Sequence, residues 1–397
     1  MRRTAIVTLR GWGLIAGGAA LLATGFAFGY PEMAVLGATA LVAVLIAVLH
    51  AALRPELSVR RAVDPDRVSR GEDSTVTLTI RNTGRFGAAT LLAHDRCGWG
   101  TQSQATVPVP LLRLRRGKET DVSYPVPTNR RGIVLVGPLQ LIRRDPLGLV
   151  SFTRGHGDTS RIWVYPKAHL MQSVPAGITR SLDGRLDRVP HGAITFDTLR
   201  EYVIGDELRH VHWRTSARVG ELMVREHVDT SLPRLVVLLD DRLASWPRFE
   251  GVTCLEFESA CEAAASIVSA AVRDDLSITL HLVSGAAAGS GRVRGTARPL
   301  LDLLAEADLA AGDPDALVTA TNRLRQHRPG DTLVYLTGTG GHHDLSLVTG
   351  LKGPFPAVAV GVLGPRIPDE PESLGVLMLR AEDGPGFASV WDGVARW

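Results

Sequence analysis

Two uncharged apolar runs near the N-terminus constrain the fold of this chain most. The first covers residues 12–28, the second covers residues 33–49, and only Gly29, Tyr30, Pro31 and Glu32 separate them. Each run approaches the ~20 apolar residues that a helix needs to cross the hydrocarbon core of a bilayer. The sequence therefore predicts a transmembrane helical hairpin within residues 1–54, with helices at about 12–29 and 33–53.

Basic residues flank the hairpin at both ends, whereas the short loop carries only Glu32. The positive-inside rule then places both ends, and the body that follows, in the cytoplasm of a multi-pass protein of the cell membrane. A cleaved signal peptide followed by one anchor is the alternative, but the first run reaches spanning length. Small residues in the first run would let the helices approach closely. The flanking basic residues are Arg2, Arg3, Arg10, Arg54, Arg60 and Arg61, and the small residues are Gly13, Gly17, Gly18, Ala19 and Ala20.

The pattern changes to period two in residues 55–166. Residues 76–81 alternate between apolar and polar, and the runs 57–60, 120–124 and 133–136 behave similarly. Glycine-containing turn signals separate the runs, and no helical period interrupts them. This spacing predicts a small antiparallel β-sandwich-like module.

Several basic residues of this module permit two interpretations. An ordinary solvated strand face is preferred, and a face toward anionic lipid is the alternative. The residues are Arg113, Arg115, Arg116, Lys118, Arg130, Arg131, Arg143 and Arg144.

A Gly- and Pro-rich linker is expected at residues 167–195, followed by an α/β domain within residues 196–397. The continuous apolar run 234–240 is typical of a buried parallel strand. Helical patterns at 255–272, 297–310 and 313–327 alternate with strand patterns at 277–283, 332–337 and 357–363. Such alternation predicts a doubly wound sheet, so the whole chain is expected to be an α+β multidomain membrane protein.

Residues 196–218 concentrate charge, aromatic rings and histidine, and three hypotheses compete for them. A hydrolase would use His212, Ser216 and Asp206, although no nucleophile-elbow glycines surround Ser216. A metal site would use His210 and His212 with Asp206 or Glu207. The preferred hypothesis is an arginine, carboxylate and aromatic network, acting between domains or, slightly less favoured, toward a partner. Its members are Arg200, Glu201, Tyr202, Asp206, Arg209, His212, Trp213, Arg214, Ser216 and Arg218.

The same stretch resembles the signature of the bacterial family known as domain of unknown function 58. The resemblance rests on residues 199–202, 205–206, 209, 212–214, 216–218, 220, 222 and 224–226. Residues 130–132, 137–138, 145–149 and 164–166 resemble the upstream pattern of that family. It implies a cytoplasm-facing membrane protein with a von Willebrand A-like C-terminal domain. Genes of such proteins often lie beside those of MoxR-type AAA ATPases and transglutaminase-like membrane proteins, and the family has no agreed activity.

The resemblance also implies where a metal ion would bind. In the von Willebrand A fold an Asp-x-Ser-x-Ser motif follows the first strand, but here the corresponding residues are Asp240, Arg242 and Ala244. A cationic side chain replaces a hydroxyl ligand, so we expect no bound Mg²⁺ and a pairing of Arg242 with Asp240 or Asp241. The Gly-rich segments 285–295 and 338–341 lack phosphate-binding motifs, so no cofactor is expected.

Charge and cysteine content exclude further classes. The 44 basic residues nearly balance the 41 acidic residues, which argues against nucleic acid as a partner. Of the three cysteines, Cys97, Cys254 and Cys261, the last two are expected to be free and buried on one helical face. The overall prediction is a non-enzymatic, bilayer-anchored scaffold that binds a partner such as a MoxR-type AAA ATPase, and the membrane-bound hydrolase is the alternative.

Overall fold

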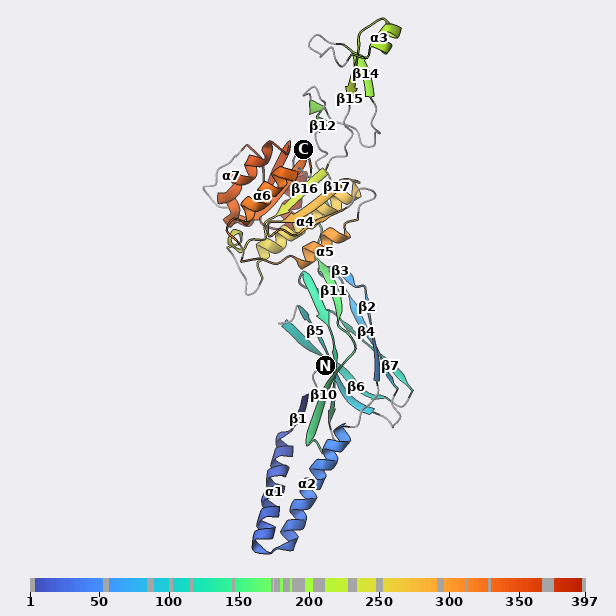
Figure 1. Ribbon diagram of the computed structural model, residues 1–397, viewed down its shortest axis with the longest axis vertical. Helices are drawn as coiled ribbons and strands as arrows, with labels where there is room; N and C mark the ends of the chain where they lie inside the picture. Colours follow the sequence, from blue (N-terminus) through green and yellow to red (C-terminus); the bar gives the residue numbers. More distant parts are fainter. Residues whose placement is uncertain are drawn as a thin grey trace. The chain divides into compact units, whose positions relative to one another are not determined.

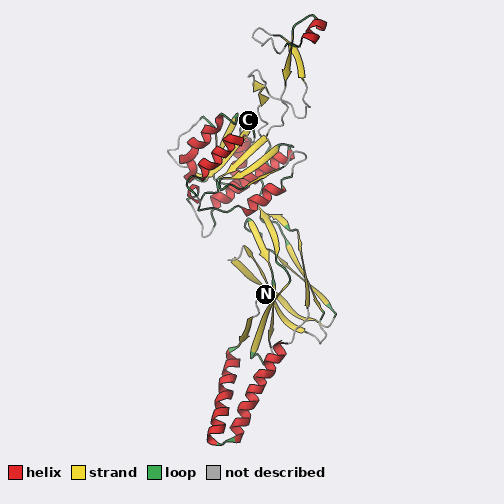
Figure 2. Cartoon of the chain, viewed as in Figure 1, coloured by secondary structure: helices red, strands yellow, loops and turns green. Residues whose placement is uncertain are grey.

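The computed structural model comprises two compact units, Met1–Val164 and Tyr165–Trp397, and each is described by itself (Figures 1 and 2). The residues that it describes are 4–52, 57–83, 89–99, 103–114, 117–144, 147–172, 174, 179–180, 186–187, 197–202, 211–227, 234–247, 253–290, 296–311, 313–327, 330–365 and 375–394.

Two apolar helices, α1 (Leu9–Phe28) and α2 (Pro31–Ala52), form an antiparallel hairpin. Both are long and apolar enough to cross a membrane. The helix α1 begins three residues earlier than the sequence indicates, because the side chain of Thr8 caps it by accepting from the Gly11 N–H. At the other end, Gly29 adopts a left-handed conformation that ends α1, and Pro31 starts α2.

The glycines that bring the helices together differ from those expected. A Cβ at Gly37 would lie 2.6 Å from the carbonyl oxygen of Gly18, and one at Gly25 would lie 2.6 Å from the nitrogen of Ala34. By contrast, Gly13 and Gly17 face open space, and Ala19 and Ala20 are exposed. Of the five small residues that the sequence indicated, only Gly18 therefore lies at the helix contact.

The β-module consists of two sheets that pack face to face. The larger sheet has the strand order β1-β10-β9-β5-β8-β11-β3, with β6 added beside β5, and the smaller has the order β2-β4-β7. Alternation in β4 turns Val76, Leu78 and Ile80 into the core, where they meet Val134 and Ile162 of the larger sheet. The strands are β1 (Thr4–Val7), β2 (Leu57–Asp64), β3 (Arg67–Ser69), β4 (Thr75–Asn82), β5 (Ala89–Trp99), β6 (Ser103–Leu114), β7 (Glu119–Pro125), β8 (Gly132–Val136), β9 (Leu139–Arg144), β10 (Val150–His156) and β11 (Ser160–Tyr165).

The strand β1 precedes the helices and was not predicted. It pairs antiparallel with β10, with Val7 opposite Val150. Four residues are too few to show a strand period, and their position before an apolar run suggests only a charged flank. The hairpin is thus inserted between two strands of the β-module, so both of its ends are attached to that module.

A buried ion pair lies in the core of the module. Arg61, which the sequence analysis counted as a flanking charge, has a side chain only 5% exposed and donates to both carboxylate oxygens of Asp95 at 3.0 Å. Tyr124 donates to the same carboxylate at 2.6 Å. Burial, reinforced by the charge of Asp95, raises the pKa of the nearby Cys97 thiol to about 11. All three cysteines are free and buried, as was expected for Cys254 and Cys261.

The basic residues of this module do not share one environment. Arg131 is buried, Arg130 is half-buried and Lys118 is exposed. The side chains of Arg113, Arg115, Arg116, Arg143 and Arg144 lie outside the described residues.

The second unit contains a six-stranded sheet in the order β18-β17-β16-β19-β20-β21. The central strands are parallel, and only the edge strand β18 runs antiparallel. Apolar clusters cover both faces, one formed with α4, α5 and α8 and the other with α6 and α7. The elements are β16 (Arg234–Leu239), α4 (Leu255–Arg273), β17 (Ser277–Leu282), β18 (Ala287–Gly289), α5 (Arg298–Glu306), α6 (Ala316–His327), β19 (Thr332–Gly338), α7 (Leu345–Thr349), β20 (Ala357–Leu363), β21 (Leu377–Ala381) and α8 (Gly384–Asp392).

The segment before this sheet packs onto it. Tyr165 donates to Asp302 at 2.6 Å, and the ring of His169 lies 3.0 Å from the Glu262 carboxylate. Met171 is 1% exposed within the cluster around α4. Residues 167–171, assigned to the linker from sequence, thus lie on the α/β unit. In the rest of that range the structure describes residues 172 and 174 and the short paired strands β12 (Thr179–Arg180) and β13 (Leu186–Asp187).

The contact between the helices generates a first prediction. We expect Gly37→Ala to destabilise the hairpin by about 1–3 kcal/mol, because the added methyl group overpacks against Gly18 and Leu22. Gly17→Ala is the matched control, since a Cβ there meets nothing within 4 Å. The measurement is the fraction of folded, detergent-solubilised full-length protein left after heating. Equal loss in the two variants would contradict this account of the contact.

Candidate functional site

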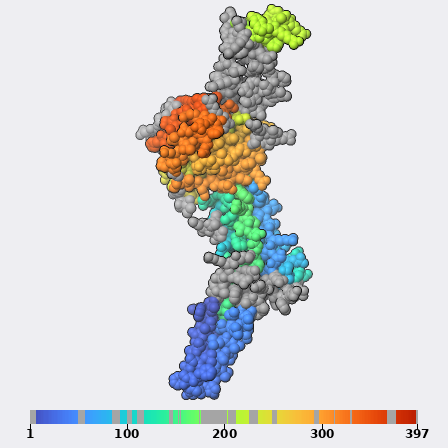
Figure 3. Space-filling model, viewed as in Figure 1, coloured from blue at the N-terminus to red at the C-terminus, as the bar shows by residue number. Residues whose placement is uncertain are grey.

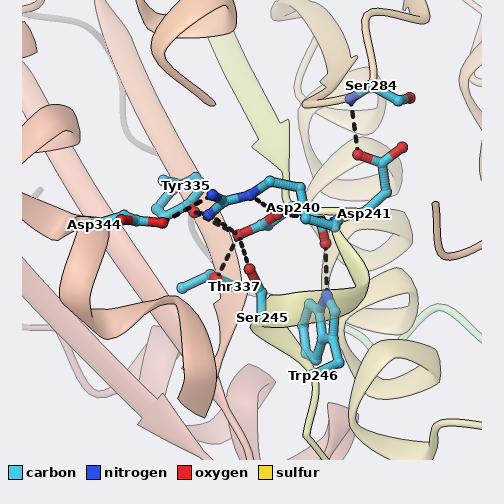
Figure 4. Close-up of polar contacts among 9 residues, drawn as sticks. Asp240, Asp241, Ser245, Trp246, Ser284, Tyr335, Thr337 and Asp344 are labelled. Carbon is cyan, nitrogen blue, oxygen red and sulfur yellow. Dashed lines mark hydrogen bonds and ion pairs between the residues drawn. The ribbon is translucent and has the colours of Figure 1, made fainter. Parts of the chain in front are cut away.

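The candidate site lies at the carboxyl end of the central strands. Asp240 directly follows β16, which lies between β17 and β19 at the place where the strand order reverses. Open α/β sheets bind ligands at such a switch point. Six side chains meet there, and we call them the Asp240 cluster (Figure 4): Asp240, Arg242, Ser245, Tyr335, Thr337 and Asp344.

Arg242 binds the buried Asp240 carboxylate with its planar guanidinium group. Its Nε donates to Oδ1 and its Nη2 donates to Oδ2, both at 2.9 Å. The remaining nitrogen, Nη1, donates to Asp344 at 2.8 Å. One cation therefore bridges two carboxylates, of which Asp240 is 0% exposed and Asp344 is 41% exposed. The expected pairing of Arg242 with Asp240 is what the structure shows.

Three hydroxyl groups complete the environment of Asp240. Its Oδ2 accepts from Ser245 at 2.7 Å, from Tyr335 at 2.7 Å and from Thr337 at 2.9 Å. The backbone N–H of Arg242 donates to Oδ1 at 3.2 Å. The indole of Trp246 also donates to the backbone carbonyl of Asp240 at 2.9 Å, which fixes the turn after β16.

The pKa of Asp240 shows how these contacts balance. Burial alone would raise it, but the hydrogen bonds and charge of Arg242, with help from Ser245 and Tyr335, lower it below its ordinary value. Burial raises the pKa of Tyr335, and the neighbouring carboxylate raises it further. The site thus holds an ionised aspartate, a protonated tyrosine and a charged arginine at neutral pH.

A divalent cation does not fit this arrangement. A carboxylate offers about four lone-pair directions, and the described contacts already bring six donors to the two oxygens of Asp240. Among the described residues, no group of three or more His, Cys, Asp and Glu side chains is arranged to hold a metal ion. The position of Ala244 offers no ligand.

Sequence analysis missed four members of the cluster, which are Ser245, Tyr335, Thr337 and Asp344. Ser245 lies one residue beyond the motif position that Ala244 occupies, so spacing alone did not reveal it. Tyr335 and Thr337 are polar residues two apart on a strand whose seven residues are all buried. That pairing of polar groups on one face of a buried strand was the available signal.

The neighbouring carboxylate, Asp241, has a different role. It accepts a hydrogen bond from the backbone N–H of Ser284 at 2.8 Å, and its own carbonyl accepts from Ala310. Burial raises its pKa. Asp241 therefore ties the β16 turn to the loops that follow β17 and α5.

The glycines after β19 serve close packing. A Cβ at Gly340 would lie 2.5 Å from the Ala244 carbonyl, and one at Gly338 would clash with the carbonyl of Ser245. A Cβ at Gly341 would collide with the hydroxyl of Thr337. These glycines let the Leu243–Ser245 turn and the Thr339–Asp344 turn meet over Asp240.

The signature stretch forms a small module of its own. The hairpin strands β14 (Asp197–Glu201) and β15 (Met223–His227) pair antiparallel, and Val211 bridges to Val224 on the other side of β15. The short helix α3 (Trp213–Val219) lies between them in sequence and ends at Gly220, which is left-handed. We call residues 197–202 and 211–227 the signature module.

Contacts in this module give Ser216 and His212 structural roles. The Ser216 hydroxyl accepts from the Met223 N–H at 2.8 Å and donates to the His212 carbonyl at 3.2 Å. The imidazole of His212 caps α3, with Nδ1 placed 2.8 Å from the Thr215 hydroxyl. No hydrogen bond between the side chains of Ser216 and His212 occurs among the described contacts, so the proposed catalytic pair is not assembled.

The other predicted site residues have mixed placements. Trp213 is 64% exposed, Arg214 and Arg218 are exposed, and Tyr202 is half-buried with its N–H bonded to the Leu222 carbonyl. The backbones of Arg200 and Glu201 belong to β14, but their side chains lie outside the described residues, as do Asp206, Glu207, Arg209 and His210 entirely. The predicted network is therefore described only in part.

The charge balance at Asp240 generates a second prediction. We expect Arg242→Met to destabilise the full-length protein by about 3–5 kcal/mol, because it leaves a buried carboxylate without its cation. The lowered pKa of Asp240 stabilises the wild-type protein at every pH above the ordinary aspartate pKa of about 3.9. Wild-type stability therefore falls only as the pH drops below that value. In the variant the pKa of Asp240 is raised, so stability instead falls as pH rises above that value. Thermal unfolding followed by tryptophan fluorescence from about pH 2 to 7 tests both signs, because this range extends below and above the ordinary aspartate pKa.

The matched control for that experiment is the double variant Asp240→Asn with Arg242→Met. Removing the carboxylate together with its cation leaves no unpaired charge at this position, so much of the stability should return and the pH dependence that Asp240 causes in Arg242→Met should disappear. A double variant as unstable as Arg242→Met would contradict the account.

The contacts of Ser216 generate a third prediction. Ser216→Ala leaves the Met223 N–H unpaired, at a cost of about 1–3 kcal/mol. We expect faster hydrogen exchange across residues 211–227 and no change around α4. Ser259→Ala is the control, because that hydroxyl bonds only to the carbonyl of Leu255 in its own helix. Unchanged exchange in the Ser216 variant would show that the hydroxyl does not hold the module together.

Comparisons with solved structures give only distant likenesses. A β-glucosidase from Erythrobacter marinus is 12% identical with a TM-score of 0.21, and the match covers 28% of this chain and 15% of the enzyme. A CARDB domain from Pyrococcus furiosus is 15% identical with a TM-score of 0.19, over 28% of this chain and 88% of that domain. The sporulation control protein Spo0M from Bacillus subtilis is 13% identical with a TM-score of 0.18, over 30% and 51%. Similarity at this level carries no argument about function.

No curated protein matches the chain significantly. Residues 198–338, however, match the family described as "Protein of unknown function DUF58". This segment includes most of the signature module and every member of the Asp240 cluster except Asp344. Over these residues the chain is similar to the DUF58 family.

Proposed function

We propose that the protein is a non-enzymatic, membrane-anchored interaction protein. Its cytoplasmic body, with a von Willebrand A-like C-terminal domain, binds a protein partner without a metal ion. The observation that carries the proposal is the Asp240 cluster, in which the Arg242 guanidinium bridges Asp240 and Asp344 at the switch point of the sheet. Because the Arg242 guanidinium already supplies a positive charge there, this observation supports a binding face that works without Mg²⁺.

The strand order supports the von Willebrand A-like assignment. The sheet is parallel except for one edge strand, and the residue after its first strand is a buried aspartate, as at the adhesion site of that fold. The two serines of that site are replaced, and Ser245 supplies a hydroxyl from the next position.

The surface of the helical hairpin supports a membrane anchor. Large apolar side chains cover both helices and their connection, and each of them is at least 36% exposed. They are Leu9, Trp12, Leu21, Phe26, Phe28, Tyr30, Met33, Val35, Leu36, Val42, Leu45, Ile46 and Leu49.

The attachment of the hairpin supports two spans rather than a cleaved leader. Because β1 pairs with β10, a cleavage after α1 would remove a strand from the β-module. The same pairing keeps both helix ends on one side of the bilayer, and the excess of arginine at those ends favours the cytoplasmic side.

The signature module supports a role in partner binding. Trp213, Val219 and Leu222 are between 41% and 64% exposed, while the described part of the module buries little more than Val211 and Val224. Tryptophan and arginine are the residues most often found at binding hot spots. The candidate partners are a MoxR-type AAA ATPase and a transglutaminase-like membrane protein, which rest on the family resemblance alone. The contacts of Ser216 argue against the hydrolase alternative.

The fourth prediction tests this proposal by purifying the tagged full-length protein from its native membrane, with and without EDTA. We expect an ATPase to co-purify in stoichiometric amount, unaffected by EDTA. Trp213→Ala should reduce its recovery at least tenfold, as a cost of about 2 kcal/mol at a hot spot implies. Leu170→Ala is the control, because Leu170 is 81% exposed and lies outside the signature module.

Two outcomes would contradict the proposal. Loss of the partner in EDTA would show that the contact needs a metal ion. Full recovery with Trp213→Ala would show that the exposed tryptophan does not contribute to binding.

A further inference from the structure

We propose that the turn between β9 and β10 enters the membrane interface and inserts Leu147 among the lipids. We call Leu147, Gly148 and Leu149 the β9–β10 turn. The inference rests on the proposed membrane anchor and adds a third contact with the bilayer, made by the β-module itself. Two observations support the inference. The turn packs against the helices, and this packing occurs at the depth of the membrane interface.

The turn packs directly on both helices. Leu149 and Val150 form one apolar cluster with Val44 and Ala47 of α2, and all four are buried. Leu14, Ile15 and Val48 pack around the same cluster. The start of β10 thus occupies the groove between the helices near their attached ends, so the turn and the hairpin form one body.

Backbone contacts hold the turn against the first residues of α1. The Thr8 N–H donates to the Leu149 carbonyl at 2.9 Å, and the Thr8 hydroxyl lies 2.8 Å from the Gly148 carbonyl oxygen. Gly11 passes so close to the Leu149 carbonyl that a Cβ there would clash. Carbonyl groups near lipid need such internal partners, because the hydrocarbon supplies none.

Aromatic residues mark the depth of the bilayer on the hairpin. Trp12 is exposed near one end and Tyr30 is exposed at the other. At 1.5 Å per residue their separation along α1 is about 27 Å, close to the ~30 Å hydrocarbon core. Tryptophan and tyrosine prefer the two membrane interfaces, so Trp12 lies at the interface nearer the β-module.

The turn reaches this level. Leu14 and Ile15 of α1, which pack against the cluster that includes Leu149, follow Trp12 toward the middle of the helix. Leu147 precedes Leu149 by two residues, at most about 7 Å of chain, and its side chain is 61% exposed. A lone exposed leucine on a soluble surface would be ordinary. Leu147 extends the apolar surface of the two helices at the level of their interfacial tryptophan. Its side chain is therefore surrounded by lipid.

The consequence is mechanical. A hairpin alone would let the β-module tilt about the helix ends, whereas a further contact between the module and the bilayer beside them resists that tilt. The β-module would then be held at a defined orientation to the bilayer.

The fifth prediction uses spin labels on the full-length protein in phosphatidylcholine–phosphatidylglycerol liposomes. Leu147→Cys carries the test label, Val42→Cys reports the hairpin, and Leu170→Cys reports the aqueous body. All three positions are at least 51% exposed, and the native cysteines are buried. Collision with oxygen, which concentrates in lipid, is compared with collision with a water-soluble nickel complex. We expect an oxygen-to-nickel ratio at Leu147 several-fold above that at Leu170 and below that at Val42.

The outcomes separate the two proposals. A ratio at Leu147 equal to that at Leu170, with a high ratio at Val42, would overturn the insertion of the turn and leave the membrane anchor intact. Equal ratios at all three positions would overturn both. Protection of Leu147 in native membranes but not in liposomes of the pure protein would assign the turn to a protein partner and overturn contact with lipid.

Discussion

The carboxylate of Asp240, which has no contact with solvent, determines how the carboxyl edge of the central sheet is built. An ionised carboxylate in such a place requires a cation and a full set of donors, since an unpaired buried charge costs several kcal/mol. Arg242 supplies the cation, and hydroxyl groups from β19 and from the Leu243–Ser245 turn supply most of the remaining donors. The loops that cross this edge are glycine-rich because they must approach one another closely enough to make these bonds.

This arrangement bears on how the binding domain that we propose would work without a metal. Under the proposed von Willebrand A-like assignment, an arginine of the chain itself takes the place of the divalent cation of an adhesion site. That arginine is already paired on both sides. Binding at this edge would therefore depend on the shape and charge of the surface, with Asp344 as its solvent-exposed carboxylate.

The first unit is organised by the insertion of two helices into a β-sandwich. Because β1 and β2 flank the hairpin, the helices leave and return to the same module, and Leu149 and Val150 are buried between them. Arg61 illustrates why membrane topology cannot be predicted here by counting the flanking basic residues alone. It follows the second helix as a topology signal would, yet its side chain pairs with Asp95 in the core.

Local patterns in the sequence determined much of this protein. Uninterrupted apolar runs indicated the two helices, strict alternation indicated strands such as β4, and a continuous apolar run indicated β16, because each depends only on the period at which side chains meet apolar surroundings. The similarity to the DUF58 family followed from the signature residues, and the presence of Arg242 two residues after Asp240 was visible directly. Tertiary structure alone decided which glycines touch the other helix, that residues 4–7 form a strand, and that Ser245, Tyr335 and Thr337 converge on Asp240. These features depend on contacts between segments far apart in the chain, whose partners no local pattern specifies.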